Sequence, residues 1–132
     1  MRLTKIAAAA GLLAACALPA AAHHSFAAEF DAAKPVTLAG EVVMMEWVNP
    51  HSWLHIDVRK PDGSVERWKI EGGSPSVLMR LGWNRSSLPA GTRVTVIGSQ
   101  AKDGSLRASS RNLTFPDGRK MDLGGSGSAA AK

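Results

Sequence analysis

The chain has 132 residues, of which 16 are Lys or Arg and 11 are Asp or Glu, giving a formal net charge of +5 at pH 7. This length allows one domain at most. The basic excess is mild and lacks the clustering typical of nucleic-acid-binding proteins, so we do not expect nucleic acid as a partner.

Residues 1–22 have the pattern of a secretory signal peptide. A basic start, Met1 to Lys5, precedes an apolar run, Ile6 to Leu18, that is too short for a transmembrane helix. Small residues of the A-x-A kind end at Ala22, where we expect cleavage. We therefore predict a periplasmic protein, and no other stretch is apolar enough to span a bilayer.

A second processing route uses Cys16. The run Leu13-Ala14-Ala15-Cys16 resembles a bacterial lipobox, in which Cys16 carries a lipid that anchors the protein to the outer membrane. The apolar run continues past Cys16, which favours cleavage after Ala22. That cleavage removes the only cysteine and so excludes disulfides and thiolate metal ligands.

The remaining chain divides into three predicted parts: an N-terminal arm at 23–35, a β-rich domain at 36–123 and a disordered tail at 124–132 that is rich in Gly, Ser and Ala. In the arm, Phe26 and Phe30 are four residues apart, so one helical turn would place both rings on one side. We expect these rings to pack on the domain.

The first strand is predicted over 36–48. Apolar residues occupy both parities in its second half, and Gly40 lies in the middle. A glycine inside a strand commonly marks a bulge or a sharp bend. A long, bent first strand lets one strand serve two sides of a small barrel.

The next two strands are predicted at 51–60 and 64–71, joined by a Pro-Asp-Gly turn. On the first of them, alternate residues form a core face: Ser52, Leu54, Ile56 and Val58. The opposite face is polar but carries Trp53. A short helix then starts at Pro75, with Ser74 as its N-cap.

Strands at 92–99 and 106–115 and a small hairpin to residue 123 complete the chain. The order β-β-β-α-β-β is that of an OB-fold, a five-stranded Greek-key barrel. We therefore predict an all-β, OB-fold-like barrel with one short helix. A β-sandwich would need more strands than this length holds. The other tryptophans, Trp47, Trp68 and Trp83, are expected to pack in the core or at the barrel end.

The four histidines are candidate metal ligands: His23, His24, His51 and His55. After cleavage at Ala22, the α-amine and imidazole of His23 can chelate Cu(II) in a plane, with His24 or His51 as the third nitrogen. Copper prefers such tetragonal nitrogen sites. Cleavage one residue earlier gives a terminal X-X-His tripeptide, which also binds Cu(II), whereas lipidation at Cys16 gives neither site.

Trp53 is a candidate ligand platform, with His55 and Arg59 on the same strand face. In OB-folds the second and third strands line the binding face, and an outward Trp there can stack on bases or sugars. The alternative is that the two Phe rings of the arm cover Trp53.

Signatures of enzymes are absent from the sequence, including G-x-S-x-G, H-E-x-x-H and a phosphate loop. We therefore expect a non-enzymatic binding module whose most concrete ligand is Cu(II) or another divalent metal. The alternatives are an interaction domain for an unknown envelope protein, without a small ligand, and an oligonucleotide- or glycan-binding module.

The stretches His-His-Ser-Phe-Ala-Ala-Glu-Phe-Asp at 23–31 and Glu-Trp-Val-Asn-Pro-His-Ser-Trp at 46–53 resemble a family of small exported proteobacterial proteins of unknown function. This resemblance implies a periplasmic protein and supplies no activity. The architecture more loosely resembles periplasmic OB-fold domains that bind ligands or cations and are not enzymes.

Overall fold

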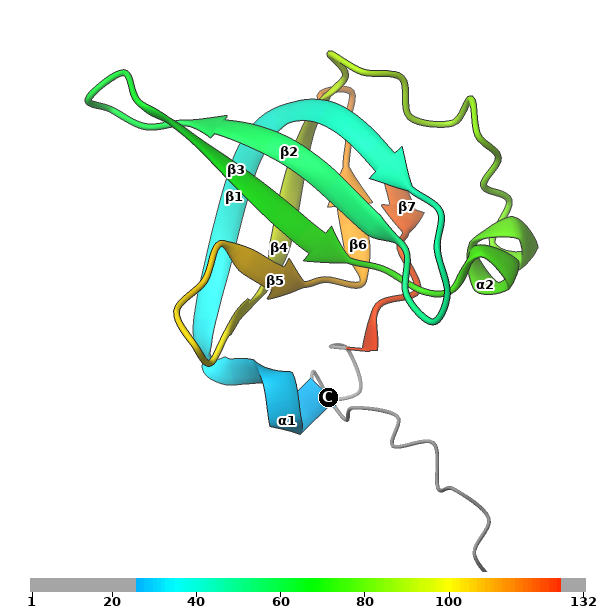
Figure 1. The fold of residues 1–132 in the computed structure, drawn as a ribbon. Helices are drawn as coiled ribbons and strands as arrows, with labels where there is room; N and C mark the ends of the chain where they lie inside the picture. Colours follow the sequence, from blue (N-terminus) through cyan, green and yellow to red (C-terminus); the bar gives the residue numbers. More distant parts are fainter. Residues whose placement is uncertain (1–25, 127–132) are drawn as a thin grey trace, which may run out of the picture.

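The computed structural model describes residues 26–126, which form a mostly β protein with two short helices (Figure 1). The predicted β-rich fold with a short helix is confirmed. No helix within the described part of the chain is long and apolar enough to cross a membrane. The predicted signal peptide, Cys16, His23 and His24 lie outside the described residues.

The strands form one seven-stranded sheet in the order β1-β2-β3-β5-β4-β6-β7, and β1 also pairs with β4. These pairings close a ring through β1, β2, β3, β5 and β4, with β3 and β5 parallel. The elements in chain order are α1 (Phe26–Glu29), β1 (Phe30–Glu46), β2 (Trp53–Arg59), β3 (Val65–Glu71), α2 (Pro75–Arg80), β4 (Arg93–Ala101), β5 (Arg107–Ser109), β6 (Asn112–Thr114) and β7 (Lys120–Asp122).

The long first strand serves two neighbours, as the sequence predicts. Its first part pairs with β4 up to Glu41, and its second part pairs with β2 from Glu41 onward. The register shifts between Val42 and Met44, so a bulge lies just beyond Gly40. Val42 is buried in the core, whereas Met44 is 49% exposed and Met45 packs against the core. The bulge therefore explains why both parities are apolar.

Gly40 lies where the backbone of β1 comes close to that of β2. A Cβ atom at this position would lie 2.6 Å from the backbone oxygen of Asp57. Only a residue without a side chain allows the two backbones to come this near. Glycine thus permits the close approach. The bulge that follows changes the face of the sheet to which the next side chains point.

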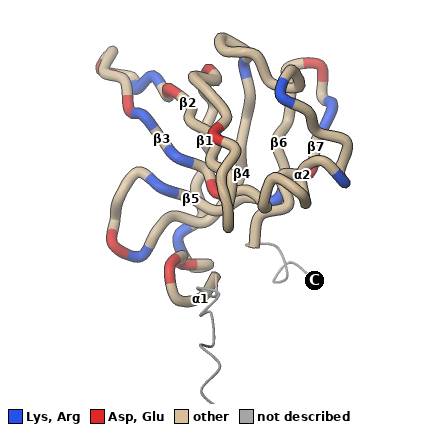
Figure 2. Tube along the Cα trace, turned by 45° about the vertical axis from the view of Figure 1, so that its right-hand side comes forward, with Lys and Arg blue, Asp and Glu red and all other residues tan. Residues whose placement is uncertain are grey.

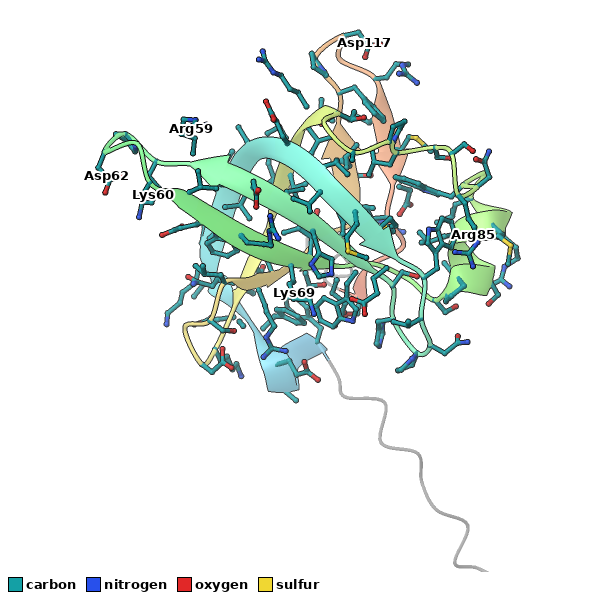
Figure 3. All side chains as sticks on the ribbon, turned by 45° about the horizontal axis from the view of Figure 1, so that its top comes forward. Arg59, Lys60, Asp62, Lys69, Arg85 and Asp117 are labelled. Atoms are coloured by element: carbon teal, nitrogen blue, oxygen red, sulfur yellow. The ribbon has the colours of Figure 1, made fainter. Side chains whose placement is uncertain are left out.

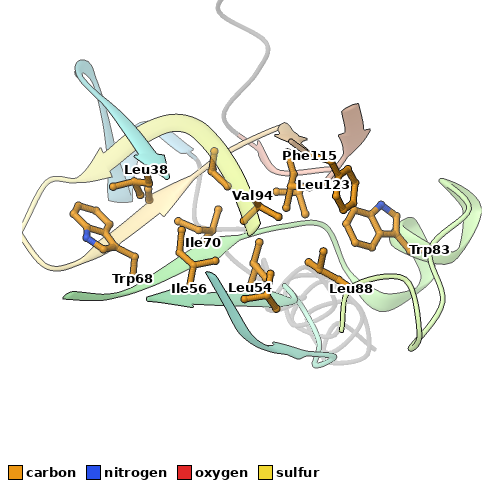
Figure 4. Packing of buried hydrophobic residues seen from close by; sticks show 14 of the residues in the cluster. Leu38, Leu54, Ile56, Trp68, Ile70, Trp83, Leu88, Val94, Phe115 and Leu123 are labelled. Carbon is orange, nitrogen blue, oxygen red and sulfur yellow. The ribbon is translucent and has the colours of Figure 1, made fainter. Parts of the chain in front are cut away.

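The core lies inside the ring of strands (Figure 4). The predicted core face of β2 is confirmed, because Ser52, Leu54 and Ile56 are fully buried and Val58 packs against the core. Trp68 and Trp83 are buried at opposite ends of the cluster, as Figure 4 shows. The cap of α2 is also as predicted, since the Ser74 hydroxyl accepts a hydrogen bond from Val77 N at 3.3 Å.

Three boundaries differ from the sequence prediction. β1 begins at Phe30, so the second half of the expected arm belongs to the sheet. The single strand expected at 106–115 is split into β5 and β6, because β4 pairs with them at different places along its length. The chain also packs beyond residue 123, where the hydroxyl of Ser126 donates a 2.8 Å hydrogen bond to Glu71 Oε1.

We predict that Gly40→Ala lowers the free energy of unfolding by about 1–3 kcal/mol, the usual cost of forcing an extra methyl group into a packed site. Urea denaturation followed by tryptophan fluorescence measures this change. Thr37→Val, at an exposed position of the same strand, is the control and should change stability by less than about 0.5 kcal/mol. Equal stability of the two variants would show that β1 does not need glycine here.

Candidate functional site

One surface carries two of the candidate residues, Trp53 and His55. We call it the outer face, and its members are Met44, Glu46, Trp53, His55 and Lys69. In the register of the sheet, Glu46 lies opposite Trp53, and Met44 lies opposite His55, which in turn lies opposite Lys69. Directly opposed residues of antiparallel strands point to the same side of a sheet. The three strands β1, β2 and β3 therefore bring these five side chains together on the side away from the core.

Glu46 is the charged centre of the outer face. His55 Nε2 lies 3.0 Å from Glu46 Oε2, and Lys69 Nζ lies 3.8 Å from the same oxygen. The hydrogen bond from His55 holds the pKa of Glu46 below its ordinary value; partial burial opposes this, and the charge of Lys69 adds to the lowering. Glu46 is therefore a carboxylate at neutral pH, and it holds the imidazole of His55 in one orientation.

Lys69 also covers Trp53. Its Nζ lies 5.5 Å from the centre of the Trp53 ring, within the range of a cation–π contact. Figure 3 shows Lys69 on the face formed by β2 and β3. A base or sugar stacking on this face of Trp53 would have to displace an ammonium group. The open platform considered from the sequence is therefore already in contact with a cation.

The arm reaches the sheet on its β5 side. Phe26 and Phe30 stack with ring centres 5.8 Å apart, as their spacing predicts, and Phe30 is buried. Lys102 donates to the backbone oxygen of Ala27, and Arg107 Nη1 lies 3.6 Å from Glu29 Oε2. These polar contacts tie the arm to β5 and to the loop before it. That the two Phe rings cover Trp53 stays a prediction.

His51 lies just before β2 and makes a separate set of contacts. Its Nδ1 is 3.3 Å from the backbone oxygen of Gly72 and 3.9 Å from Glu71 Oε1. Because a carbonyl oxygen can only accept, Nδ1 is the nitrogen that carries the proton, and Nε2 keeps its lone pair. The His51 side chain is 28% exposed. It borders a pocket of about 420 Å³ lined by Asn49, Pro50, His51, Gly73, Ser74, Val77, Gly124 and Ser126.

Arg59 lies away from these groups, at the opposite end of β2. Arg59 lies six positions after Trp53, which is about 20 Å along an extended strand. It lines a different hollow of about 490 Å³, together with Asp57 and Arg93. Figure 3 shows Arg59 beside the β2–β3 turn, far from Lys69. The structure thus brings Trp53 and His55 together and leaves Arg59 apart.

Lys60, just after β2, and Arg67 and Lys69 of β3 are paired with acids. Arg67 makes two hydrogen bonds to Asp57, at 2.8 and 2.9 Å, and Lys60 Nζ lies 3.0 Å from Glu66 Oε1. Figure 2 shows Lys and Arg interspersed with Asp and Glu along these strands. Such a surface is neutral in sum and does not form the basic track that a polyanion needs.

Within residues 26–126, no group of three or more His, Cys, Asp or Glu side chains could hold a metal ion. His51 contacts Gly72 and Glu71, whereas His55 contacts Glu46, so each imidazole has its own surroundings. A complete site at His51 would need ligands from outside this range, and His23 and His24 are the candidates.

Sequence reasoning missed Glu71 and Glu46 as partners of His51 and His55, and Lys69 as a partner of Glu46. Each faces its partner across the sheet, in a register that the sequence pattern alone does not fix. The one usable signal was the alternation of side chains along β3. Trp68 and Ile70 point into the core, so Lys69 between them points outward.

We predict that His55→Phe raises the pKa of Glu46 toward its ordinary value, because the substitution removes the hydrogen bond that favours the carboxylate. In the wild type, this favourable contribution to folding is complete above the pKa of an unfolded glutamate. It is lost as the pH falls through the lower pKa of the folded protein. The chemical shift of the Glu46 carboxyl carbon, measured by NMR against pH in the wild type and in His55→Phe, gives the pKa in each protein.

Asp62 is the internal control for this titration. Its pKa is lowered by the hydroxyl and the backbone N–H of Ser64, in the β2–β3 turn, so it should not respond to the substitution. If the Glu46 titration were unchanged in His55→Phe, the contact between the two side chains would be absent in solution.

Comparison with known proteins gives a family without an assigned activity. No curated protein and no solved structure matches this chain. A family model described as "Family of unknown function (DUF6152)" matches residues 9–110, which is most of the sequence. The chain therefore belongs to DUF6152, a family of unknown function.

Proposed function

We propose that this protein is an exported, non-enzymatic binding module with an OB-fold-like barrel, and that it binds Cu(II) through its N-terminal histidines and His51. The barrel is supported by the ring of β1, β2, β3, β5 and β4, with α2 between β3 and β4. An OB-fold is a five-stranded Greek-key barrel whose second and third strands carry the ligand. In this chain, β2 and β3 are bordered by His51 and Glu71.

The orientation of His51 is the observation that carries the metal proposal. Metal-ligating histidines almost always donate the N–H of their other ring nitrogen to a backbone carbonyl or a carboxylate. His51 has this arrangement, with Nδ1 toward Gly72 O and near Glu71 Oε1. Its Nε2 is therefore the nitrogen available to a metal. His55 differs, since its Nε2 is engaged by Glu46.

The path of the arm supports the participation of His23. His23 lies three positions before Phe26 in the sequence. The chain can therefore span at most about 10 Å between them. The arm is tied to β5 by the ion pair of Glu29 and Arg107. In turn, Ser109 of β5 pairs with Glu71, the residue beside His51. Under this proposal, the new N-terminus left by cleavage after Ala22 approaches His51 from the β5 side of the sheet.

Among the alternatives, an oligonucleotide or glycan is disfavoured by Lys69 over Trp53 and by the paired charges of β2 and β3. An envelope protein partner without a small ligand remains the competing proposal. It predicts that the metal-free protein and the Cu(II)-loaded protein capture the same partners.

The test is a Cu(II) titration of the chain that begins at His23, followed by electron paramagnetic resonance. We expect about one tightly bound ion per chain with a tetragonal nitrogen signal. Three non-histidine residues added ahead of His23, which avoid an X-X-His terminus, should weaken binding by at least about tenfold, since removing a ligand costs no less than the 10–100-fold lost with an outer-shell partner. His51→Ala should weaken it by about tenfold on the same reasoning.

His55→Gln is the matched control, because it changes an imidazole on the same strand that the proposed Cu(II) site does not use. Equal affinity of the extended and unextended chains would remove the amine site. The intact mass of the protein from its native envelope shows whether the chain begins at His23 or carries a lipid on Cys16.

A further inference from the structure

Met44 is an apolar side chain that the fold turns toward solvent. It lies on a strand between the buried Val42 and the core-packed Met45, yet it is 49% exposed. The cause is the register shift between Val42 and Met44, which exchanges the inward and outward faces of β1. Bulges of this kind re-aim a side chain at a defined place on a sheet. The thioether of Met44 is not used by the proposed Cu(II) site.

The residue directly across from Met44 is His55. Directly opposed residues of an antiparallel pair have Cβ atoms about 4.5–5.5 Å apart and point to the same side. A thioether and an imidazole are therefore neighbours on the outer face. The next opposed pair along the two strands is Glu46 and Trp53.

Glu46 prepares His55 as a ligand. The imidazole uses Nε2 for its 3.0 Å contact with Glu46 Oε2, and within residues 26–126 its Nδ1 has no hydrogen-bond partner. In the neutral ring whose Nε2–H donates to the carboxylate, the lone pair lies on Nδ1, and the contact fixes the orientation of the ring. Nδ1 is thus the available donor atom of His55.

The outer face also tolerates a positive charge. Lys69 Nζ lies 3.8 Å from Glu46 and 5.5 Å from the centre of the Trp53 ring, so the fold already places one cation between a carboxylate and an aromatic face. A monovalent metal ion beside His55 would lie near the same two groups, the carboxylate charge and the negative face of the indole, and would share them with Lys69.

We propose that Met44 Sδ and His55 Nδ1 form a separate site for a soft monovalent metal ion, of the class of Cu(I), with Glu46 as the positioning residue. Thioether sulfur selects soft ions such as Cu(I), and imidazole binds copper in general. Mg²⁺ and Ca²⁺ need several oxygen ligands, whereas the carboxylate of Glu46 at this place is already engaged by His55 and Lys69. The proposal goes beyond the Cu(II) site, because it requires neither the N-terminal amine nor His51.

The test uses Ag(I) as the probe, since it shares the softness and charge of Cu(I) and does not change oxidation state under these conditions. The full mature chain is titrated while the methionine methyl resonances are followed by NMR, with an Ag(I) chelator in competition to give Kd. We expect the Met44 methyl signal to shift and the Trp53 fluorescence to change as Ag(I) binds.

Variants then assign the ligands. Met44→Leu and His55→Gln should each weaken Ag(I) binding by at least about tenfold, and Glu46→Gln by about tenfold, the usual loss on removing an outer-shell partner. Met79→Leu is the matched control, because Met79 is also exposed but lies on α2. Circular dichroism and the unfolding midpoint confirm that each variant is folded.

The outcomes separate this site from the N-terminal one. His51→Ala and the chain extended ahead of His23 should keep full Ag(I) affinity at Met44, whatever they do to Cu(II). The proposal is overturned if Met44→Leu binds Ag(I) as tightly as Met79→Leu, or if saturating Ag(I) leaves the Met44 methyl signal in place.

Discussion

The close approach of β1 to β2 at Gly40, followed at once by a bulge, is the constraint on which the rest of the structure depends. Because a Cβ atom there would meet the Asp57 backbone oxygen at 2.6 Å, the two strands can converge only at a glycine. This convergence lets β1 leave β4 and continue on β2, which closes the ring of strands around one core. A straight first strand would pair with one neighbour and leave the apolar interior open on one side.

The same bulge determines which side chains form the outer face. Without the register shift, the parity that buries Val42 would also bury Met44, and Met45 would point outward in its place. With the shift, Met44 and Glu46 face outward beside His55 and Trp53, and the hydrogen bond between Glu46 and His55 becomes possible. The irregularity of the backbone is therefore not incidental to the chemistry on this surface, since it places both an acceptor and a thioether next to an imidazole.

Features that depend on nearby residues could be predicted from the sequence. The two-residue alternation of β2 identified its buried residues, and Ser74-Pro75 identified the start of α2, because both signals arise within a few residues. The partners of the histidines could not be predicted, because Glu46 and Glu71 come from other strands. Gly40 indicated a bend, but the bulge itself follows by a few residues, and only the register shows that Met44 points outward. The alternation of residues in the sequence thus identifies the buried face of a strand, whereas the pairing register of the strands is needed to identify contacts between side chains.

Two imidazoles on one short segment invite the idea of a single metal site, and the geometry argues against it. His51 and His55 are four residues apart, which is about 13 Å along an extended strand, too far to share one ion. Each also has its own acceptor, Gly72 O for His51 and Glu46 for His55, so the available nitrogen is Nε2 in the first and Nδ1 in the second.

The other groups near each histidine also differ. In the proposed Cu(II) site, His51 is combined with nitrogen ligands of the N-terminus, whereas His55 lies opposite the thioether of Met44, which suits a softer ion. The length of the segment thus keeps the two proposed sites apart. At the second site, the carboxylate of Glu46 orients the imidazole of His55.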